Sequence, residues 1–84
     1  MKTDRVVKII RNNEPPTKYD YKYFEVILES DKKKIFHYHI NNPIPTDEQM
    51  LGLTWEEVRQ LALNMFNEAV NEAYRREKIN VSTV

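Results

Sequence analysis

The longest amphipathic pattern lies near the C-terminus, where apolar residues recur at helical spacing with no Gly or Pro between them. The spacing predicts one long helix over about residues 55–78. The centre of its apolar face comprises Trp55, Val58, Ala62, Met65, Phe66, Ala69 and Ala73. Leu61 extends this face on one side, and Leu63, Val70 and Tyr74 extend it on the other. The apolar arc is about twice as wide as one contact surface requires. Either a sheet and a short helix together cover it, or the flank of Leu63, Val70 and Tyr74 meets a second chain.

The start of this helix is marked by several signals. Thr54 is a favourable N-cap, and Glu57 three residues later completes a capping box. Leu53 and Val58 have the spacing of a hydrophobic staple. The end is less sharply marked, because the residues around 80–83 are poor helix formers. We expect fraying near Ile79, with residues 79–84 forming a tail that is either disordered or an added edge strand.

The segment over residues 5–11 is rich in β-branched residues and predicts a first strand. Its alternation is imperfect, so either Val7 and Ile9 or Val6 and Ile10 could face the core. Apolar residues on both faces suit a central strand or one covered on both sides. The prolines at positions 15 and 16 predict a connecting loop over residues 12–19.

Residues 20–30 and 34–41 alternate between apolar and polar positions and predict a β-hairpin. The even-numbered residues should face the long helix. A three-residue loop over residues 31–33 keeps the two faces separate, because paired residues share a side of the sheet. This register pairs Leu28 with Phe36, Val26 with Tyr38 and Phe24 with Ile40. On the outer face it sets Glu25 opposite His39 and Ile27 opposite His37.

A second capping box, formed by Thr46 and Gln49, predicts a short helix over residues 47–51 that ends at Gly52. The predicted fold is therefore a two-layer α+β domain spanning residues 1–84. In it, a three-stranded antiparallel sheet packs against one long C-terminal helix, with a short helical turn before that helix.

Composition narrows the functional classes. The 84 residues suffice for one modest core, their formal net charge is zero, and there is no cysteine. The first half of the chain is mildly basic and the second half mildly acidic, which is weak support for a dedicated nucleic-acid domain. No apolar run is long enough for a membrane span or a signal peptide, so we expect a cytoplasmic protein.

The candidate chemistry is sparse. His37 and His39 lie two apart on one strand, and with Glu25 they offer three metal ligands but no fourth. We therefore predict no metal site. The single glycine excludes a glycine-rich phosphate loop, and no serine lies beside a plausible base. We predict no catalytic residues, no cofactor and no enzymatic activity.

The outer face of the predicted sheet is the first candidate binding surface. It carries an aromatic and apolar set comprising Tyr21, Tyr23, Ile27, Ile35, His37 and His39. Aromatic residues are favoured at protein interfaces, so this face predicts a protein partner. The alternative is a nucleic acid that stacks on the rings and contacts Lys22, Lys32, Lys33 and Lys34.

The sequence thus predicts a small non-enzymatic interaction or regulatory protein that binds a protein partner. The helix flank of Leu63, Val70 and Tyr74 is a second candidate interface, and it is also suited to a homodimer. The composition is compatible with an accessory or inhibitor protein of a bacterium or of its virus.

Overall fold

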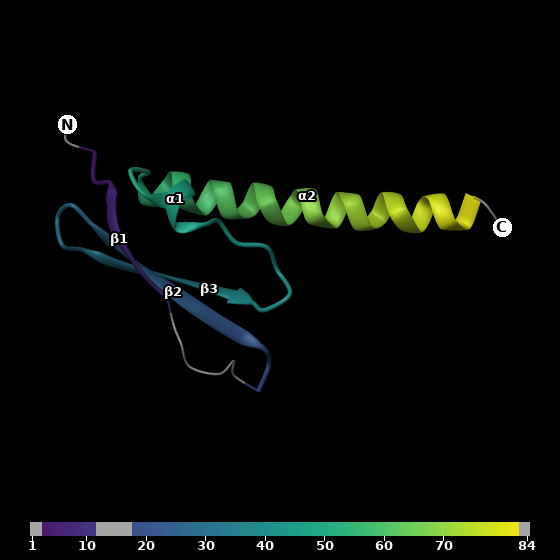
Figure 1. The fold of residues 1–84 in the computed structure, drawn as a ribbon, viewed down its shortest axis with the longest axis horizontal. Coiled ribbons are helices and arrows are strands. Elements are labelled where there is room, and N and C mark those ends of the chain that lie inside the picture. The colour runs from purple at the N-terminus through teal and green to yellow at the C-terminus, as the bar shows by residue number, and fades with distance from the viewer. Residues whose placement is uncertain (1–2, 12–17, 83–84) are drawn as a thin grey trace.

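The computed structural model describes residues 3–11 and 18–82, with side chains up to Arg76 (Figure 1). The elements follow the order β1 (Val6–Arg11), β2 (Tyr21–Leu28), β3 (Lys33–His39), α1 (Asp47–Met50) and α2 (Trp55–Ser82). The strands form one antiparallel sheet in the order β1-β2-β3. The predicted α+β fold, with three antiparallel strands followed by a long helix, is therefore confirmed.

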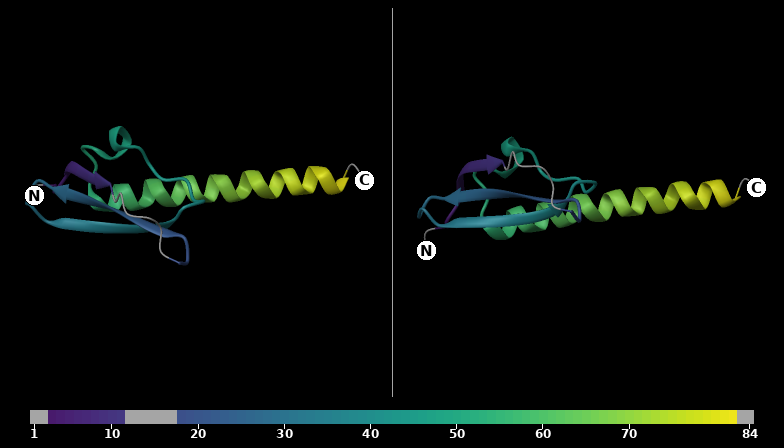
Figure 2. Two further views of the ribbon diagram at one scale, coloured as in Figure 1. Left: turned by 60° about the horizontal axis from the view of Figure 1, so that its bottom comes forward. Right: turned by 90° about the horizontal axis from the view of Figure 1, so that it is seen from below.

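Both helices lie on the same face of the sheet, and Figure 2 shows the other face without a helix over it. The core forms between these two layers. It contains Phe24, Val26 and Leu28 from β2, Met50 from α1 and Val58 from α2. The even-numbered residues of β2 are therefore the inward-facing set, as the alternation predicts.

The β2–β3 hairpin has the predicted loop length but a different register. Phe24 pairs with Phe36, whereas the sequence argument paired Phe24 with Ile40. The loop comprises residues 29–31, since the Leu28 N–H donates to the Lys32 carbonyl. Asp31 takes a positive φ of 69° there. A three-residue loop needs a left-handed residue at its third position, and Asp accepts that conformation more readily than the Lys33 of the expected loop.

Strand β1 contains a bulge that neither predicted facing allows for. Val6 pairs with Leu28 and Lys8 pairs with Ile27, so Val7 is an extra residue in the strand. The bulge reverses the alternation, and Val6 and Ile9 both pack on the core while Val7 is exposed. The expectation of a central or doubly covered strand is also wrong, because β1 is at an edge of the sheet.

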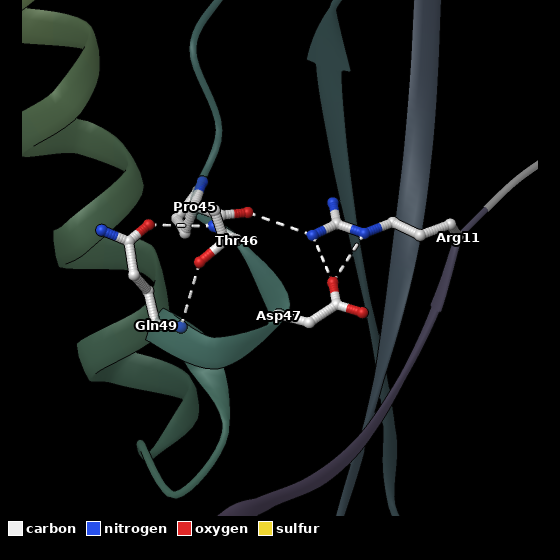
Figure 3. Close-up of polar contacts among 5 residues, drawn as sticks. All are labelled: Arg11, Pro45, Thr46, Asp47 and Gln49. Atoms are coloured by element: carbon white, nitrogen blue, oxygen red, sulfur yellow. Dashed lines mark hydrogen bonds and ion pairs between the residues drawn. The ribbon is translucent and has the colours of Figure 1, made fainter.

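Helix α1 forms as its capping box predicts and is tied to β1 by one arginine. The Thr46 N–H donates to Gln49 Oε1 at 2.9 Å, and the Gln49 N–H donates to Thr46 Oγ1 at 3.2 Å. Arg11 donates from Nε and Nη2 to Asp47 Oδ1, and from Nη2 to the Pro45 carbonyl (Figure 3). These contacts hold the connection from β3 over the core face of the sheet.

The segment between α1 and α2 covers the start of the β1 edge. The Val6 N–H donates to the Leu53 carbonyl at 2.8 Å, and the Gly52 N–H donates to the Val6 carbonyl at 2.9 Å. Arg5 forms an antiparallel bridge with Thr54 and also donates from its side chain to the Gly52 carbonyl. The first residues of β1 therefore already have backbone partners at the edge of the sheet, and no further strand can pair with them there.

Replacing Gly52 by alanine is expected to lower the free energy of unfolding by about 1–2 kcal/mol. Gly52 has a φ of +84°, and an added Cβ would meet no atom within 4 Å. The cost therefore comes from the left-handed backbone alone. Urea unfolding measures this loss of stability. Gly52→Asn should lower the free energy of unfolding by less, because Asn tolerates the left-handed conformation. Equal losses for the two variants would contradict this explanation.

Helix α2 begins as predicted but reaches further than predicted. The Glu57 N–H donates to Thr54 Oγ1 and the Thr54 N–H donates to Glu57 Oε1, which completes the capping box. The bond from the Thr54 N–H also lowers the pKa of Glu57. The helix continues to Ser82, past the expected end near residue 78, because no Gly or Pro interrupts it. Residues 83 and 84 of the expected tail, and residues 12–17 of the expected loop, lie outside the described residues.

Candidate protein-binding surface

The hairpin register brings the six predicted outer-face residues together in two adjacent rows. Tyr21 lies opposite His39, and Tyr23 lies opposite His37. Ile27 and Ile35 follow on β2 and β3, with Glu25 paired to Ile35. The set comes from two neighbouring strands and occupies one side of the sheet, as the alternation predicts. We call it, together with Glu25, the outer sheet face.

The hydrogen-bond pattern of the ladder draws these side chains close to one another. Leu28 bonds Lys32 and Asp20 bonds Ile40, so the even-numbered pairs between β2 and β3 are the hydrogen-bonded ones. The odd-numbered pairs are then of the non-hydrogen-bonded kind, in which opposing side chains lie closer. The outer sheet face is therefore built from the tighter set of cross-strand pairs.

Two aromatic contacts order one end of this face. The rings of Tyr21 and His39 are edge-to-face, with centroids 5.5 Å apart. The rings of Tyr23 and His37 are tilted, with centroids 5.8 Å apart. The Nδ1 of His39 accepts a hydrogen bond from the Asn41 N–H at 3.2 Å, so the neutral imidazole carries its hydrogen on Nε2. Each histidine of this face therefore contacts the tyrosine that lies opposite it.

Strand β1 adds residues that the sequence pattern did not predict for this face. Ile10 pairs with Glu25, and Lys8 pairs with Ile27, so both belong to the outer face. Glu25 consequently lies between Ile10 and Ile35, one on each neighbouring strand. The sequence left the facing of β1 open and did not specify the strand order, and the bulge at Val7 decides the facing. No local signal in the sequence identifies Ile10 as part of this surface.

The four lysines proposed for nucleic acid do not share one face. Lys33 pairs with Ile27 and belongs to the outer face. Lys22 pairs with Tyr38, and Lys34 pairs with Val26, which places both on the helix-covered side. Lys32 directly follows the hairpin loop. The register therefore distributes the lysine charges over both sides of the sheet. On the outer face, Lys8 of β1 and Lys33 of β3 flank Ile27 of β2.

The register also separates the three candidate metal ligands. Glu25 was expected opposite His39, but it pairs with Ile35, while each histidine pairs with a tyrosine. Among the residues that the structure describes, no group of three or more His, Cys, Asp and Glu side chains could hold a metal ion. The outer face thus presents its imidazoles as parts of aromatic pairs.

The second candidate interface, on α2, lies in the other layer of the fold. Leu63, Val70 and Tyr74 are all exposed. Leu63 lines a groove together with Phe36 of β3, whereas Val70 and Tyr74 lie further along α2, whose C-terminal part extends past the sheet in Figure 1. The two candidate surfaces are therefore separate, and a change to one leaves the other in place.

Asp4 contacts the loop of the β2–β3 hairpin, which is the end of the hairpin away from the two aromatic pairs. Asp4 accepts hydrogen bonds from the Ser30 hydroxyl and from the Ser30 N–H. The hydroxyl bond is the main cause that lowers the pKa of Asp4, and Lys32 and Lys34 add a smaller effect of the same sign. This contact supports the hairpin loop that sets the register of the outer face.

Comparison with known proteins found no matching family model, and no curated protein or solved structure with significant similarity. No helix within residues 3–11 and 18–82 is long and apolar enough to cross a membrane.

Proposed function

We propose that this chain is a non-enzymatic binding module that docks a protein partner on the outer sheet face. One observation carries the proposal. Aromatic and isoleucine side chains from adjacent strands are gathered on the side of the sheet opposite α1 and α2, where no helix within the described residues lies. Tyr21 and Ile35 are each 48% exposed there. Contiguous apolar surface of this kind marks interaction sites on small soluble proteins.

The composition of this face favours a protein over a nucleic acid. Aromatic residues are enriched at protein interfaces. Glu25, between Ile10 and Ile35, would repel a phosphate but could pair with a basic side chain of a partner. With Lys22 and Lys34 on the other side of the sheet, Lys8 and Lys33 are the lysines left to neutralise phosphates on this face.

The test uses the full chain with a double substitution, Tyr23→Ala with Ile27→Ala, and a matched control, Leu63→Ala with Val70→Ala. Proteins captured by the wild type and the control but lost with the first variant are taken forward as partners. Their dissociation constants should then rise about 100-fold or more for Tyr23→Ala with Ile27→Ala, since central aromatic anchors dominate interface energies. Equal affinity of the two variants would place the site elsewhere.

Two further measurements keep this test decisive. Tyr23 and Ile27 are half-buried, so thermal unfolding must show that the double variant remains folded. Ile35→Ala alters only an exposed side chain and should weaken the same partner at least severalfold. An affinity for single-stranded nucleic acid that falls steeply with salt would instead support the alternative function.

A further inference from the structure

Helix α2 extends well past the part of the fold that supports it. It has 28 residues and is therefore about 42 Å long. Val58 and Ala62 are buried and Trp55 packs on the core. From residue 63 to residue 76 every side chain is exposed except the half-buried Met65. The first two to three turns of α2 thus rest on the sheet, and the remainder projects from it (Figure 1).

The projecting part carries an apolar stripe. Leu63 is 51% exposed, Phe66 40%, Val70 49% and Tyr74 64%. The spacings of three, four and four residues put these side chains on one side of the helix, about a third of a turn away from the buried Val58. Ala73 borders the same stripe, and the opposite side is polar, comprising Asn64, Glu68, Asn71 and Arg75. Leu63, Phe66, Val70 and Ala73 follow one another in steps of three, four and three residues, which is the pattern of a helix-pairing seam.

A helix of this kind needs a partner. Helices shorter than about 12–15 residues are marginal in water, and most helices in proteins are stabilised by packing an apolar face. Nothing that the structure describes packs on the stripe, because Leu63, Phe66, Val70 and Tyr74 are all exposed. The projecting segment is therefore expected to gain stability when the stripe is covered.

We propose that a second copy of this chain covers the stripe, with the two α2 helices packed antiparallel. Leu63 and Phe66 lie in the first half of the stripe, Val70 and the bordering Ala73 lie in its second half, and Tyr74 follows at its end. An antiparallel pair sets Leu63 of each copy against Ala73 of the other, and Phe66 against Val70. Large side chains then face small ones, which fills the interface evenly. A parallel pair would set Phe66 against Phe66 and leave a gap between two Ala73 residues.

The charges and dipoles of α2 favour the same orientation. Glu56 and Glu57 lie in the first turn, and Arg75 and Arg76 lie at the end of the described side chains. Antiparallel packing opposes the two helix dipoles, and it puts the acidic start of one helix at the same end of the pair as the basic end of the other. A parallel pair would align like charges. The same patch serves both copies, as a two-fold interface requires.

A groove beside the first turns of α2 can receive the end of the partner helix. It has a volume of about 360 Å³ and is lined by Phe36, Glu56, Arg59, Gln60, Ala62 and Leu63. In the antiparallel register, the region around Tyr74 of one copy lies against this groove of the other. The interface is formed by one stripe on one helix of each copy, so we expect dissociation in the micromolar range.

The first test is the solution mass of the full chain, measured by sedimentation from about 1 μM to about 1 mM to bracket that affinity. The wild type should shift from monomer to dimer across this range. Val70→Glu should remain monomeric, whereas Asn71→Glu, which adds the same charge on the polar side, should still dimerise. A wild type that stays monomeric, or a Val70→Glu variant that dimerises as the wild type does, would overturn the proposal.

The second test reads the orientation directly, because the chain contains no cysteine. Leu63→Cys and Ala73→Cys are made as separate variants, mixed and oxidised. The mixture should form a disulfide between the two different variants, and neither variant alone should cross-link to itself. Self-linking of either variant would establish a parallel pair and overturn the antiparallel arrangement. These results are independent of the proposed function, because the stripe and the outer sheet face are separate surfaces.

Discussion

Replacing Phe24 by alanine is expected to lower the free energy of unfolding by about 3–5 kcal/mol. Among the residues whose burial the structure describes, Phe24 is the largest fully buried side chain. Its ring stacks on Phe36 with centroids 5.3 Å apart and lies 6.0 Å from the ring of Tyr38. The guanidinium carbon of Arg11 lies over the Phe24 ring, 5.2 Å from its centroid. Alanine would remove the apolar contacts and leave a cavity between the sheet and α1.

The loss is large compared with the whole stability of such a domain. At the usual 0.05–0.15 kcal/mol per residue, a chain of this length has roughly 4–13 kcal/mol in total. Chemical denaturation followed by circular dichroism measures the difference. Ile35→Ala on the outer face of the same sheet is the control and should cost less than about 1 kcal/mol. A Phe24→Ala variant no less stable than this control would contradict the described core.

Replacing Met50 by alanine is expected to lower the free energy of unfolding by about 2–5 kcal/mol. Met50 is fully buried, although α1 has only four residues, and it is the side chain by which this helix enters the core. Without it, the helix would be held mainly by Arg11 and its own capping box. Both are surface contacts, and an exposed ion pair contributes at most about 1 kcal/mol. The segment from 46 to 54 should therefore loosen first.

The neighbouring residue supplies the control for Met50. Leu51 has a side chain of similar size but is 47% exposed, so Leu51→Ala should cost less than about 1 kcal/mol. Amide hydrogen exchange adds a local measurement, because Met50→Ala should speed exchange at Gly52, whose N–H bonds to Val6. Equal stability losses for the two variants would show that α1 does not anchor through Met50.

Helix starts and strand faces could be predicted because they depend on neighbours in the sequence. Both capping boxes join residues three apart, so Thr46 with Gln49 and Thr54 with Glu57 identify their helices directly. The alternation of Phe24, Val26 and Leu28 identifies the inner face of β2 in the same way. The outer sheet face followed from this alternation, and its six predicted residues lie together in the structure.

The hairpin register shows where such reasoning fails. If β3 slides along β2 by an even number of residues, every side chain keeps its side of the sheet. The alternation of apolar and polar residues therefore fits all of these registers equally well. The backbone of Asp31 made the choice, since its left-handed conformation places the loop at residues 29–31. In this register Glu25 lies opposite Ile35 and not opposite His39, so the expected grouping of Glu25 with the two histidines does not form.

Patterns in the sequence were enough to predict the elements, both helix starts, the inner face of β2 and the chemical character of the outer sheet face. The tertiary structure decided the bulge at Val7, the strand order, the addition of Ile10 to the outer face and how much of α2 the sheet supports. These depend on contacts between residues far apart in the chain, such as Val6 with Leu53 and Arg11 with Asp47. A pattern of period two or 3.6 records which side a residue faces, but it does not record which distant segment lies there.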